Sequence, residues 1–528
     1  MLNQKSGEQI MTNPLNRGSP LLHRIGVEPI INCTGVRAIN GNSRLTKSVR
    51  TAMDEASRVF VNMDELQRAA GRYTAEMIAA ENALITSGSA ASLTLAVAAC
   101  VAGNDPHRIL KLPLSDPDRR LVLVPADQRF SYEHSLRLAG CNIEFPRDKQ
   151  ELLCQLGKKP CMICALARRS EDSVLSIRRL KVLTGGQIPI LVDAAGFCPT
   201  HPDPWLAKGA DLVAYSLGKF VGGPAASGLL AGRRDLVEAA SAIAAPHQGF
   251  GRGFKIGKEQ IAGAVAALEE WFRDGCCAKL PTMLERRLNL ISNRLACEAG
   301  ISVSIARAPG NVAPRLRISW DPAKIPTTVS ELRNRLLKRT PRIMIDDPRR
   351  LPYEVSIDPT CLRDDEADAV AIGVLEELKS AVLRIGVQER NEVKSLEGLW
   401  RYRIDYPMHA REGTIIIPNG RLLSEATVNI DGQEVIAKAS IDNNKLRISC
   451  ETAHDEWTIY YRFEGTVTPK GIRGRVSGGM ARREHDSSAF REQFGTAPWS
   501  ASRENSSYLS TGEVGAMSVA GNFRGATI

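Results

Sequence analysis

The sequence predicts an α/β protein in which a mostly parallel sheet is covered by helices, followed by a smaller α+β domain and an all-β module. Three observations predict this order. Up to about residue 279, short apolar runs such as "RRLVLVP" and "IPILVDAAG" alternate with amphipathic helical patterns, which is typical of parallel sheets buried on both faces. Shorter strand-like runs then alternate with helical segments to about residue 388. Turn-bounded segments with alternating apolar residues follow from about residue 396 to 503.

The chain of 528 residues is longer than one hydrophobic core usually serves, so several domains are expected. We assign residues 21–279 to a large α/β domain, 280–388 to a small α+β domain and 396–503 to an all-β meander or small barrel. Residues 1–20 are polar and residues 504–528 are small and polar, so we expect a flexible N-terminus and a flexible tail.

Composition and charge indicate which kinds of partner the protein has. The longest apolar stretch is too short to span a bilayer and residues 1–20 lack the apolar core of an export signal, so no membrane association is expected. The twelve cysteines are scattered through apolar segments, which favours a cytoplasmic location. Cys161 and Cys164 lie in a strand-like run and face opposite sides, so neither a metal site nor a redox pair is expected. The net charge of +10 is spread among acidic residues, which favours anionic metabolites over nucleic acid.

The first segment that carries chemistry is "ALITSGSAASLTLAVAAC", which predicts a strand, a turn of small residues and a helix. Such a turn exposes backbone N–H groups at the positive end of a helix and leaves room for a phosphate. The turn consists of Ser87, Gly88, Ser89 and Ala90, and its serines add hydroxyl donors. The turn alone is weak evidence for a phosphate site.

Asp193 ends the apolar run "IPILVDAAG", and the carboxyl ends of parallel strands form the edge where α/β proteins bind ligands. Lys219 follows a second such run, "ADLVAYS", and is flanked by Gly218 and Gly222. Ser216 is a further hydroxyl donor beside it. Taken singly, a strand-terminal aspartate is often a cap, and a lysine between glycines is more often an idle surface charge than a nucleophile.

Together, a phosphate-binding turn, an acid and a lysine meet the needs of pyridoxal 5'-phosphate. The turn holds the phosphate ester, the acid keeps the pyridine nitrogen protonated, and the lysine binds the aldehyde carbon covalently. The remaining alternative at this point is a chain that keeps the fold without the cofactor.

These motifs resemble the pyridoxal-phosphate enzymes of fold-type I. The branch in question contains L-seryl-tRNA(Sec) selenium transferase and D-glucosaminate-6-phosphate ammonia-lyase. The resemblance covers about residues 21–388 and is densest in "GVEPIINCTGVRAINGNSR", "LVDAAGFCP" and "GADLVAYSLGKFVGGPAASGLLAG". It implies that Lys219 and Asp193 are the catalytic residues, and that the Ser87 to Ala90 turn holds the phosphate. Ser216 is a candidate further donor from its position alone. It also implies an active site between the two domains and a homodimer or a higher homo-oligomer.

The chain departs from this family's pattern at three positions. Leu217 replaces the first glycine of the usual "SGGK", and Ala225 stands where glutamine is common. Gln128 occupies the place of a histidine that lies near the cofactor ring in lyase-like relatives, which makes Gln128 the candidate for that contact. His134 lies farther along a predicted helix.

Basic residues in two regions are candidates for binding a substrate carboxylate or phosphate. Arg252 and Lys255 lie in the glycine-rich loop "APHQGFGRGFKIG", for which a solvated basic face is the alternative interpretation. Arg315, Arg317 and Arg342 belong to the smaller domain and are candidates by topology alone.

The sequence favours a lyase that acts on an amino acid or amino-sugar acid. With the cofactor bound, Lys219 would remove the α-proton and β-elimination would follow. Selenium transfer to seryl-tRNA, racemisation and transamination stay open as alternatives, although tRNA is not an expected partner because no basic domain precedes the cofactor domain. An alternative of another class is a non-catalytic binding protein in which the all-β module does the work. Its Trp400, Trp457 and Trp499 are interpreted as core residues.

Overall fold

The computed structural model describes residues 20–114, 120–307, 313–346, 351–383, 396–418, 425–442, 444–454, 457–482 and 494–504. The expected flexible N-terminus and tail lie outside the described residues, apart from their innermost positions, Pro20 and Glu504. The chain divides into two compact units, Met1–Val387 and Gln388–Ile528.

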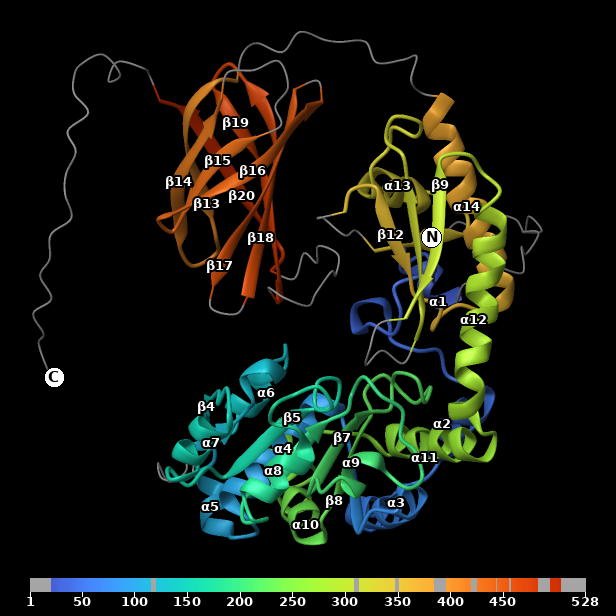
Figure 1. Cartoon of the computed structure of the whole chain (residues 1–528), viewed down its shortest axis with the longest axis vertical. Helices are drawn as coiled ribbons and strands as arrows, with labels where there is room; N and C mark the ends of the chain where they lie inside the picture. Colours follow the sequence, from blue (N-terminus) through green and yellow to red (C-terminus); the bar gives the residue numbers. More distant parts are fainter. Residues whose placement is uncertain are drawn as a thin grey trace, which may run out of the picture. The chain divides into compact units, whose positions relative to one another are not determined.

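A seven-stranded sheet with the order β2-β8-β7-β6-β5-β3-β4 organises the larger part of the first unit (Figure 1). Its strands run parallel except β8, which is antiparallel to both neighbours. This confirms the predicted, mostly parallel α/β sheet. The strands are β2 (Asn82–Thr86), β3 (Leu121–Leu123), β4 (Asn142–Glu144), β5 (Met162–Leu166), β6 (Ile190–Asp193), β7 (Leu212–Ser216) and β8 (Gly228–Gly232).

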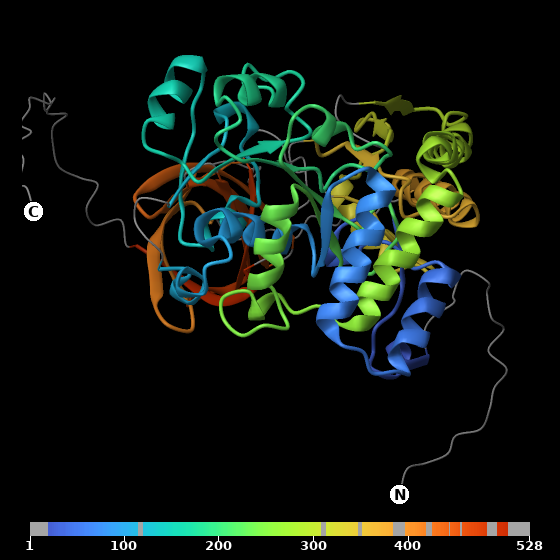
Figure 2. The ribbon, with the colours of Figure 1, turned by 90° about the horizontal axis from the view of Figure 1, so that it is seen from below.

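Helices cover both faces of this sheet because its side chains alternate between two hydrophobic cores. In β7, Val213 and Tyr215 join one core, and Leu212 and Ala214 join the other. The first core is closed by α2 (Lys47–Ser57), α3 (Met63–Ile78), α7 (Lys149–Leu156), α8 (Ile177–Leu183), α9 (Pro204–Ala207) and α11 (Lys258–Arg273). The second is closed by α4 (Ser89–Ala102), α5 (Pro106–Lys111), α6 (Glu133–Arg137) and α10 (Arg234–Ile243). Figure 2 shows α2, α3 and α11 side by side.

Helix α4 is apolar around its whole circumference, and most of its residues are buried. A helix with this composition can only lie inside a protein, so the sequence places α4 at the centre of its layer. Its described first turn contains no acidic residue and no side-chain cap. The positive end of its dipole is therefore left for another partner.

The smaller domain combines three antiparallel strands in the order β12-β10-β9 with a parallel pair, β1-β11. The pair includes β1, at the start of the chain, so Ile31 and Cys33 belong to the core of this domain. The predicted bound at residue 280 did not include this strand. The elements are β1 (Ile30–Asn32), β9 (Ile301–Ala306), β10 (Arg315–Trp320), β11 (Arg342–Met344), β12 (Glu354–Ile357), α1 (Pro20–Arg24), η1 (Ala38–Asn40), α12 (Cys276–Leu295), α13 (Val329–Leu336) and α14 (Asp364–Leu383).

The second unit is a closed antiparallel barrel in which β20 returns to pair with β13. This confirms the predicted all-β module as a barrel. In β13, Trp400, Tyr402 and Ile404 point inward while Arg401 and Arg403 are exposed, as expected from the two-residue period of a strand. The strands are β13 (Gly398–Asp405), β14 (Ala410–Ile417), β15 (Ala426–Ile430), β16 (Gln433–Asp442), β17 (Lys445–His454), β18 (Trp457–Thr468), β19 (Gly471–Arg482) and β20 (Thr496–Arg503).

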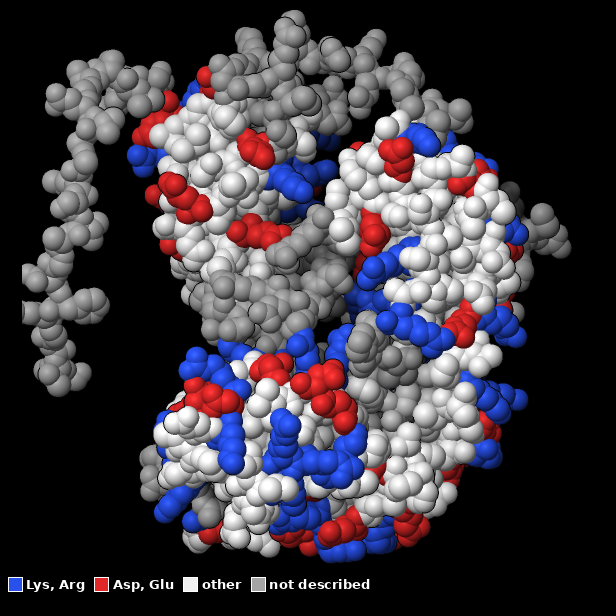
Figure 3. All heavy atoms as spheres, in the orientation of Figure 1, with Lys and Arg blue, Asp and Glu red and all other residues white. Residues whose placement is uncertain are grey.

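The barrel interior is filled by side chains. Tyr402 and Trp499 both pack edge-to-face on Phe463, with ring centroids 5.4 and 5.1 Å away. Trp400 and Trp499 are buried core residues, as the sequence predicts, whereas Trp457 is half-buried. On the face seen in Figure 3, basic and acidic side chains are intermixed. Within the described residues, the helices that are long enough to cross a bilayer are not apolar enough to do so.

Candidate functional site

A pocket of about 320 Å³ lies where the carboxyl ends of the central strands meet the smaller domain. Parallel strands place the residues that follow them at one edge of the sheet, which is why these segments converge there. The lining residues from the large domain are Phe130, Ser131, Tyr132, Leu166, Arg168, Asp193, Ala195, Gly196, Phe197, Lys219 and Phe220. Thr34, Val36, Arg37, Ala313, Arg315 and Asp358 line the opposite side.

Asp193 is the last residue of β6 and is almost fully buried. Its Oδ1 atom accepts a hydrogen bond from the backbone N–H of Ala195 at 2.9 Å, which fixes the carboxyl at the strand end. Burial raises the pKa of Asp193, against the opposing effects of the Ala195 N–H and the Lys219 ammonium. A buried carboxyl of this kind gains most from a cationic partner that is also removed from water.

Lys219 lies in the turn after β7 and is half-buried. Burial lowers the pKa of its amine, while the Asp193 carboxylate opposes this effect. A lowered pKa increases the fraction of neutral amine, which is the form that acts as a nucleophile or base. The sequence-predicted acid and lysine therefore share one pocket, and each is shifted toward its neutral form.

The turn around Lys219 is tight enough to require its glycines. A β-carbon on Gly218 would lie 2.8 Å from the Pro224 carbonyl oxygen, and Gly222 has a φ of +77°. Leu217 N–H donates to the Ser227 carbonyl at 3.1 Å. The Leu217 side chain is fully buried in the core beneath the sheet, so the departure from the family's glycine fills space in that core.

The predicted phosphate turn joins β2 to α4. Gly88 has a φ of +143°, and a β-carbon there would meet nothing within 4 Å, so open space lies before the first turn of α4. Its other side is closely packed, because a β-carbon on Gly228 would lie 2.5 Å from the Gly88 carbonyl carbon and 2.7 Å from the Ser89 nitrogen. The N–H groups that begin a helix have no partner within it, so this turn suits an anion.

Strand register brings the predicted phosphate donors to one sheet edge. Gly228 is paired with Thr86 on one side and with Ser216 on the other. Asp193 is paired with Ala214, two residues before Ser216. In the described part of the chain, Ser216 and the Ser87 to Ala90 turn extend this edge but do not line the 320 Å³ pocket itself.

Gln128 is fully buried and does not line the pocket, as far as the described residues define it. Its Oε1 accepts from the Leu166 N–H at 2.9 Å and its Nε2 donates to the Leu175 carbonyl at 3.1 Å. Both ends of the amide are therefore occupied by backbone. Phe130, two residues later, lines the pocket instead, and the aromatic residue in "DQRFSY" is the signal that could have identified it.

Among the candidate substrate cations, Arg315 lines the pocket. Arg317 is exposed and lies 4.0 Å from Glu354, and Arg342 donates to the carbonyls of Leu337 and Glu28. Arg252 belongs to η4 (Arg252–Phe254) and Lys255 follows it. Neither residue is among the described residues that line the pocket.

Sequence reasoning missed three charged residues of the pocket, namely Arg37, Arg168 and Asp358. Arg37 forms a two-point ion pair with Asp346, at 2.6 and 2.7 Å. Burial raises the pKa of Asp346, although the Arg37 guanidinium opposes this. Asp358 follows the apolar run "YEVSI", so the strand-end signal that identified Asp193 was also present here.

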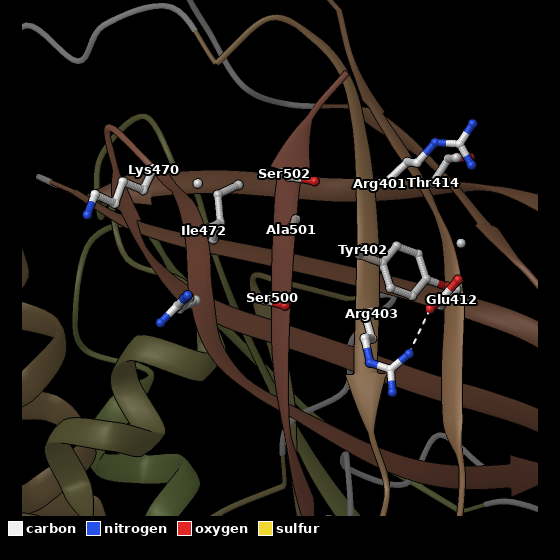
Figure 4. Close-up of a pocket in the computed structure, with 13 residues that line it drawn as sticks. Arg401, Tyr402, Arg403, Glu412, Thr414, Lys470, Ile472, Ser500, Ala501 and Ser502 are labelled. Carbon is white, nitrogen blue, oxygen red and sulfur yellow. Dashed lines mark hydrogen bonds and ion pairs between the residues drawn. The ribbon is translucent and has the colours of Figure 1, made fainter. Parts of the chain in front are cut away.

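A second and larger hollow, of about 590 Å³, lies on the outer wall of the barrel (Figure 4). Most of its side chains come from outward positions of β13, β14, β19 and β20, whereas Tyr402, Ile472 and Ala501 belong to the barrel core. Arg403 points toward Glu412 at 2.8 Å. Ser500 lies between Arg403 and Arg473 in the strand register. The larger volume does not make this hollow the stronger candidate, because the predicted acid and lysine both line the smaller pocket.

Comparison with known proteins finds relatives of this chain. No family model matches the chain. The chain is 29% identical over 376 residues to the 5'-C-glycyluridine monooxygenase-decarboxylase of a Streptomyces species, covering 67% of this chain and 90% of the relative. It is 29% identical over 263 residues to the D-glucosaminate-6-phosphate ammonia lyase of Salmonella typhimurium, covering 48% and 70%. A solved D-glucosaminate-6-phosphate ammonia-lyase structure superposes with a TM-score of 0.59 at 24% identity, covering 69% of this chain and 99% of that one.

Proposed function

We propose that this chain, a homologue of D-glucosaminate-6-phosphate ammonia lyase with the fold of the fold-type I pyridoxal-phosphate enzymes, is a pyridoxal-phosphate-dependent lyase. Its substrate would be an amino acid or an amino-sugar acid. The observation that carries the proposal is the presence of Lys219 and Asp193 in one pocket, where burial lowers the pKa of the amine and raises that of the acid. Both homologues are themselves enzymes.

The residues present fit pyridoxal phosphate. Lys219 would bind the aldehyde carbon, Asp193 would pair with the ring nitrogen, and the turn from Ser87 to Ala90, with Ser216, would hold the phosphate. The fit is supported by the open space at Gly88 and by the close packing of Gly228 behind it. When bound, the cofactor supplies a cationic ring that withdraws electrons from the substrate carbon carrying the amine.

The chain's own part in the reaction falls mainly to Lys219. Its lowered pKa favours a neutral amine, which can take the proton from the α-carbon of the substrate. Loss of a group from the β-carbon then completes an elimination, and Lys219 can return its proton to the leaving group. Asp193, fixed by the Ala195 N–H, would supply the negative charge that pairs with the ring nitrogen.

Decarboxylation is a second candidate. It is favoured by the longer alignment with the monooxygenase-decarboxylase, 376 residues against 263 for the ammonia lyase. Such a reaction breaks the bond from the α-carbon to its carboxyl group, whereas the lyase reaction breaks the C–H bond at the same carbon. Release of carbon dioxide with uptake of oxygen would identify it, and release of ammonia with a keto acid would identify the lyase.

A homodimer is part of the proposal. The loop between α2 and α3 exposes Val59, Phe60 and Val61 together, and Phe60 is fully exposed. An apolar loop of this kind gains stability when another surface covers it, and we assign that role to a second copy of the chain. The scatter of cysteines through apolar segments supports a cytoplasmic location.

The proposal is tested by adding pyridoxal phosphate to the purified protein and recording its visible absorption before and after borohydride reduction. A visible band and a reduced pyridoxyl group on the peptide that contains Lys219 are expected. Lys219→Ala should lose both, while Lys149→Ala, which changes an exposed lysine of α7, should keep both. A folded wild-type protein that acquires neither would contradict the proposal and favour a non-catalytic role.

A further inference from the structure

Arg37, Arg315 and Asp358 line the side of the pocket that the smaller domain forms, and a second aspartate, Asp346, is bound to Arg37. Arg37 is bound at two points by Asp346, and both side chains are largely buried. Arg315 lies 3.6 Å from Asp358, measured from Nη2 to Oδ2. The positive charge of this wall is thus matched by carboxylates of the protein itself.

Asp358 is held in place by the chain on both sides of it. Its backbone N–H donates to the Cys33 carbonyl at 2.9 Å. Its Oδ1 atom accepts from the backbone N–H of Thr360 at 2.9 Å and from the Thr360 hydroxyl at 2.6 Å. Because Oδ1 already has two donors, Oδ2 is the oxygen that remains for a ligand.

The turn at Gly35 is shaped around this carboxylate. Gly35 has a φ of +77°, and a β-carbon there would lie 2.5 Å from Oδ2 of Asp358 and 2.7 Å from its Cγ. The Asn32 side chain donates to the Gly35 carbonyl at 3.0 Å, and Thr34 forms a bridge with Asp358. Two segments that are distant in sequence therefore fix one carboxylate at the pocket.

The separation of Arg315 and Asp358 leaves both groups able to bind a ligand. At 3.6 Å the two attract each other but are too far apart for a good hydrogen bond. The guanidinium can still donate to a substrate carboxylate, and Oδ2 can still accept from a hydroxyl or an ammonium group. A phosphate dianion at the same place would meet the fixed negative charge of Asp358.

We propose that Asp358 determines substrate specificity, selecting an amino acid whose side chain carries a hydroxyl or amino group and disfavouring a phosphorylated one. The inference rests on the proposed function, since it concerns the substrate of the same pocket. It differs from what the name of the ammonia lyase relative says of that protein, which acts on a 6-phosphate. The cofactor phosphate is not affected, because its place is the turn at Gly88.

The test is a calorimetric titration of the pyridoxal-phosphate-loaded protein with serine, 2,3-diaminopropionate and O-phosphoserine. These probes share a backbone and differ in the group that would face Asp358. The wild type should bind the first two more tightly than O-phosphoserine. Asp358→Asn should weaken 2,3-diaminopropionate by roughly tenfold to a hundredfold, as expected for one lost hydrogen bond to a charged group, and should strengthen O-phosphoserine.

Asp321→Asn is the matched control, because Asp321 is an exposed acid of the same domain, and it should leave the order of affinities unchanged. Thr360→Ala is a second variant that keeps the charge of Asp358 and removes the hydroxyl donor to Oδ1 while the backbone N–H donor stays. It loosens the carboxylate and should reduce the preference in the same direction. An unchanged order of affinities in Asp358→Asn and Thr360→Ala, with the visible cofactor band intact, would overturn the inference alone. If the wild type binds no cofactor, the proposed function fails, and the same titration of the protein as purified still decides the role of Asp358.

Discussion

Gly228 packs so closely against Gly88 that a β-carbon on Gly228 would stand 2.5 Å from the Gly88 carbonyl carbon. The first residue of β8 thereby supports the turn that is proposed to hold the cofactor phosphate. We expect Gly228→Ala to displace this turn, to weaken pyridoxal phosphate binding by tenfold or more, on the order of the loss of one charged hydrogen bond, and to lower the melting temperature. Gly253→Ala has free space around its β-carbon and serves as the control. Unchanged cofactor affinity in Gly228→Ala would show that this turn does not bind the cofactor phosphate.

Asp193→Asn keeps the shape of the side chain and removes its charge. We expect a fall in turnover of about a hundredfold or more, which is the usual loss when one fixed electrostatic contact to the reacting group is removed. The Asn Oδ1 atom can still accept the Ala195 N–H, so the fold should be retained. Steady-state kinetics check this, with Asp172→Asn as an exposed control. A variant as active as the wild type would show that Asp193 does not pair with the ring.

Although Asp193→Asn should lower activity, it should stabilise the cofactor-free protein at neutral pH. Because the folded-state pKa of Asp193 is raised by burial, the ionised carboxylate destabilises the cofactor-free protein at neutral pH. Below the ordinary pKa of aspartate the two proteins should melt together. As the pH rises through the raised pKa of Asp193, Asp193→Asn should become the more stable of the two. Thermal unfolding of both cofactor-free proteins across this pH range provides the comparison, and a difference that does not depend on pH would argue against a buried ionised carboxyl.

Phe130→Ala tests a contact with the ligand, and Gln128→Ala tests a contact that stabilises the fold. Phe130 lines the pocket, so its loss should weaken cofactor or substrate binding. Gln128 bonds only to the backbone of Leu166 and Leu175 among its described contacts, so its loss should lower the free energy of unfolding by about 1–3 kcal/mol and spare affinity in the folded protein. Urea unfolding and cofactor titration of both variants measure the two effects. The reverse pattern would restore Gln128 as the ring contact.

The barrel should be dispensable for cofactor binding. It has a hydrophobic core of its own, and the chain divides into separate compact units at residue 387. We expect residues 1–387 expressed alone to form the same visible band with pyridoxal phosphate as the full chain. Circular dichroism of the fragment checks that it is folded. A folded fragment that does not bind the cofactor would assign the barrel a part in the site.

Features of the fold and the site that depend on residues close together in the sequence could be predicted from it. Asp193 and Lys219 each follow an apolar run, and parallel strands bring the ends of such runs together. Arg37 and Asp346 are 309 positions apart, and no local pattern indicates that they meet. Phe130 lines the pocket and Gln128 does not, because of the direction that side chains take around the short turn η3 (Ala126–Gln128). Composition does not specify this direction. The pairing of β1 with β11 is likewise set by the tertiary fold.

Two stretches of chain cross between the cores of the first unit. Helix α12 contributes Leu284 to the core of the large domain and Leu288 to that of the small domain, only one helical turn apart. The segment from Ile31 to Val49 likewise begins in the second of these cores and ends in the first. A rigid helix and a tethered strand that both span the junction leave little freedom for sliding. We therefore expect any movement between the two domains to be a rotation about these two crossings, which would carry Arg315 with the smaller domain.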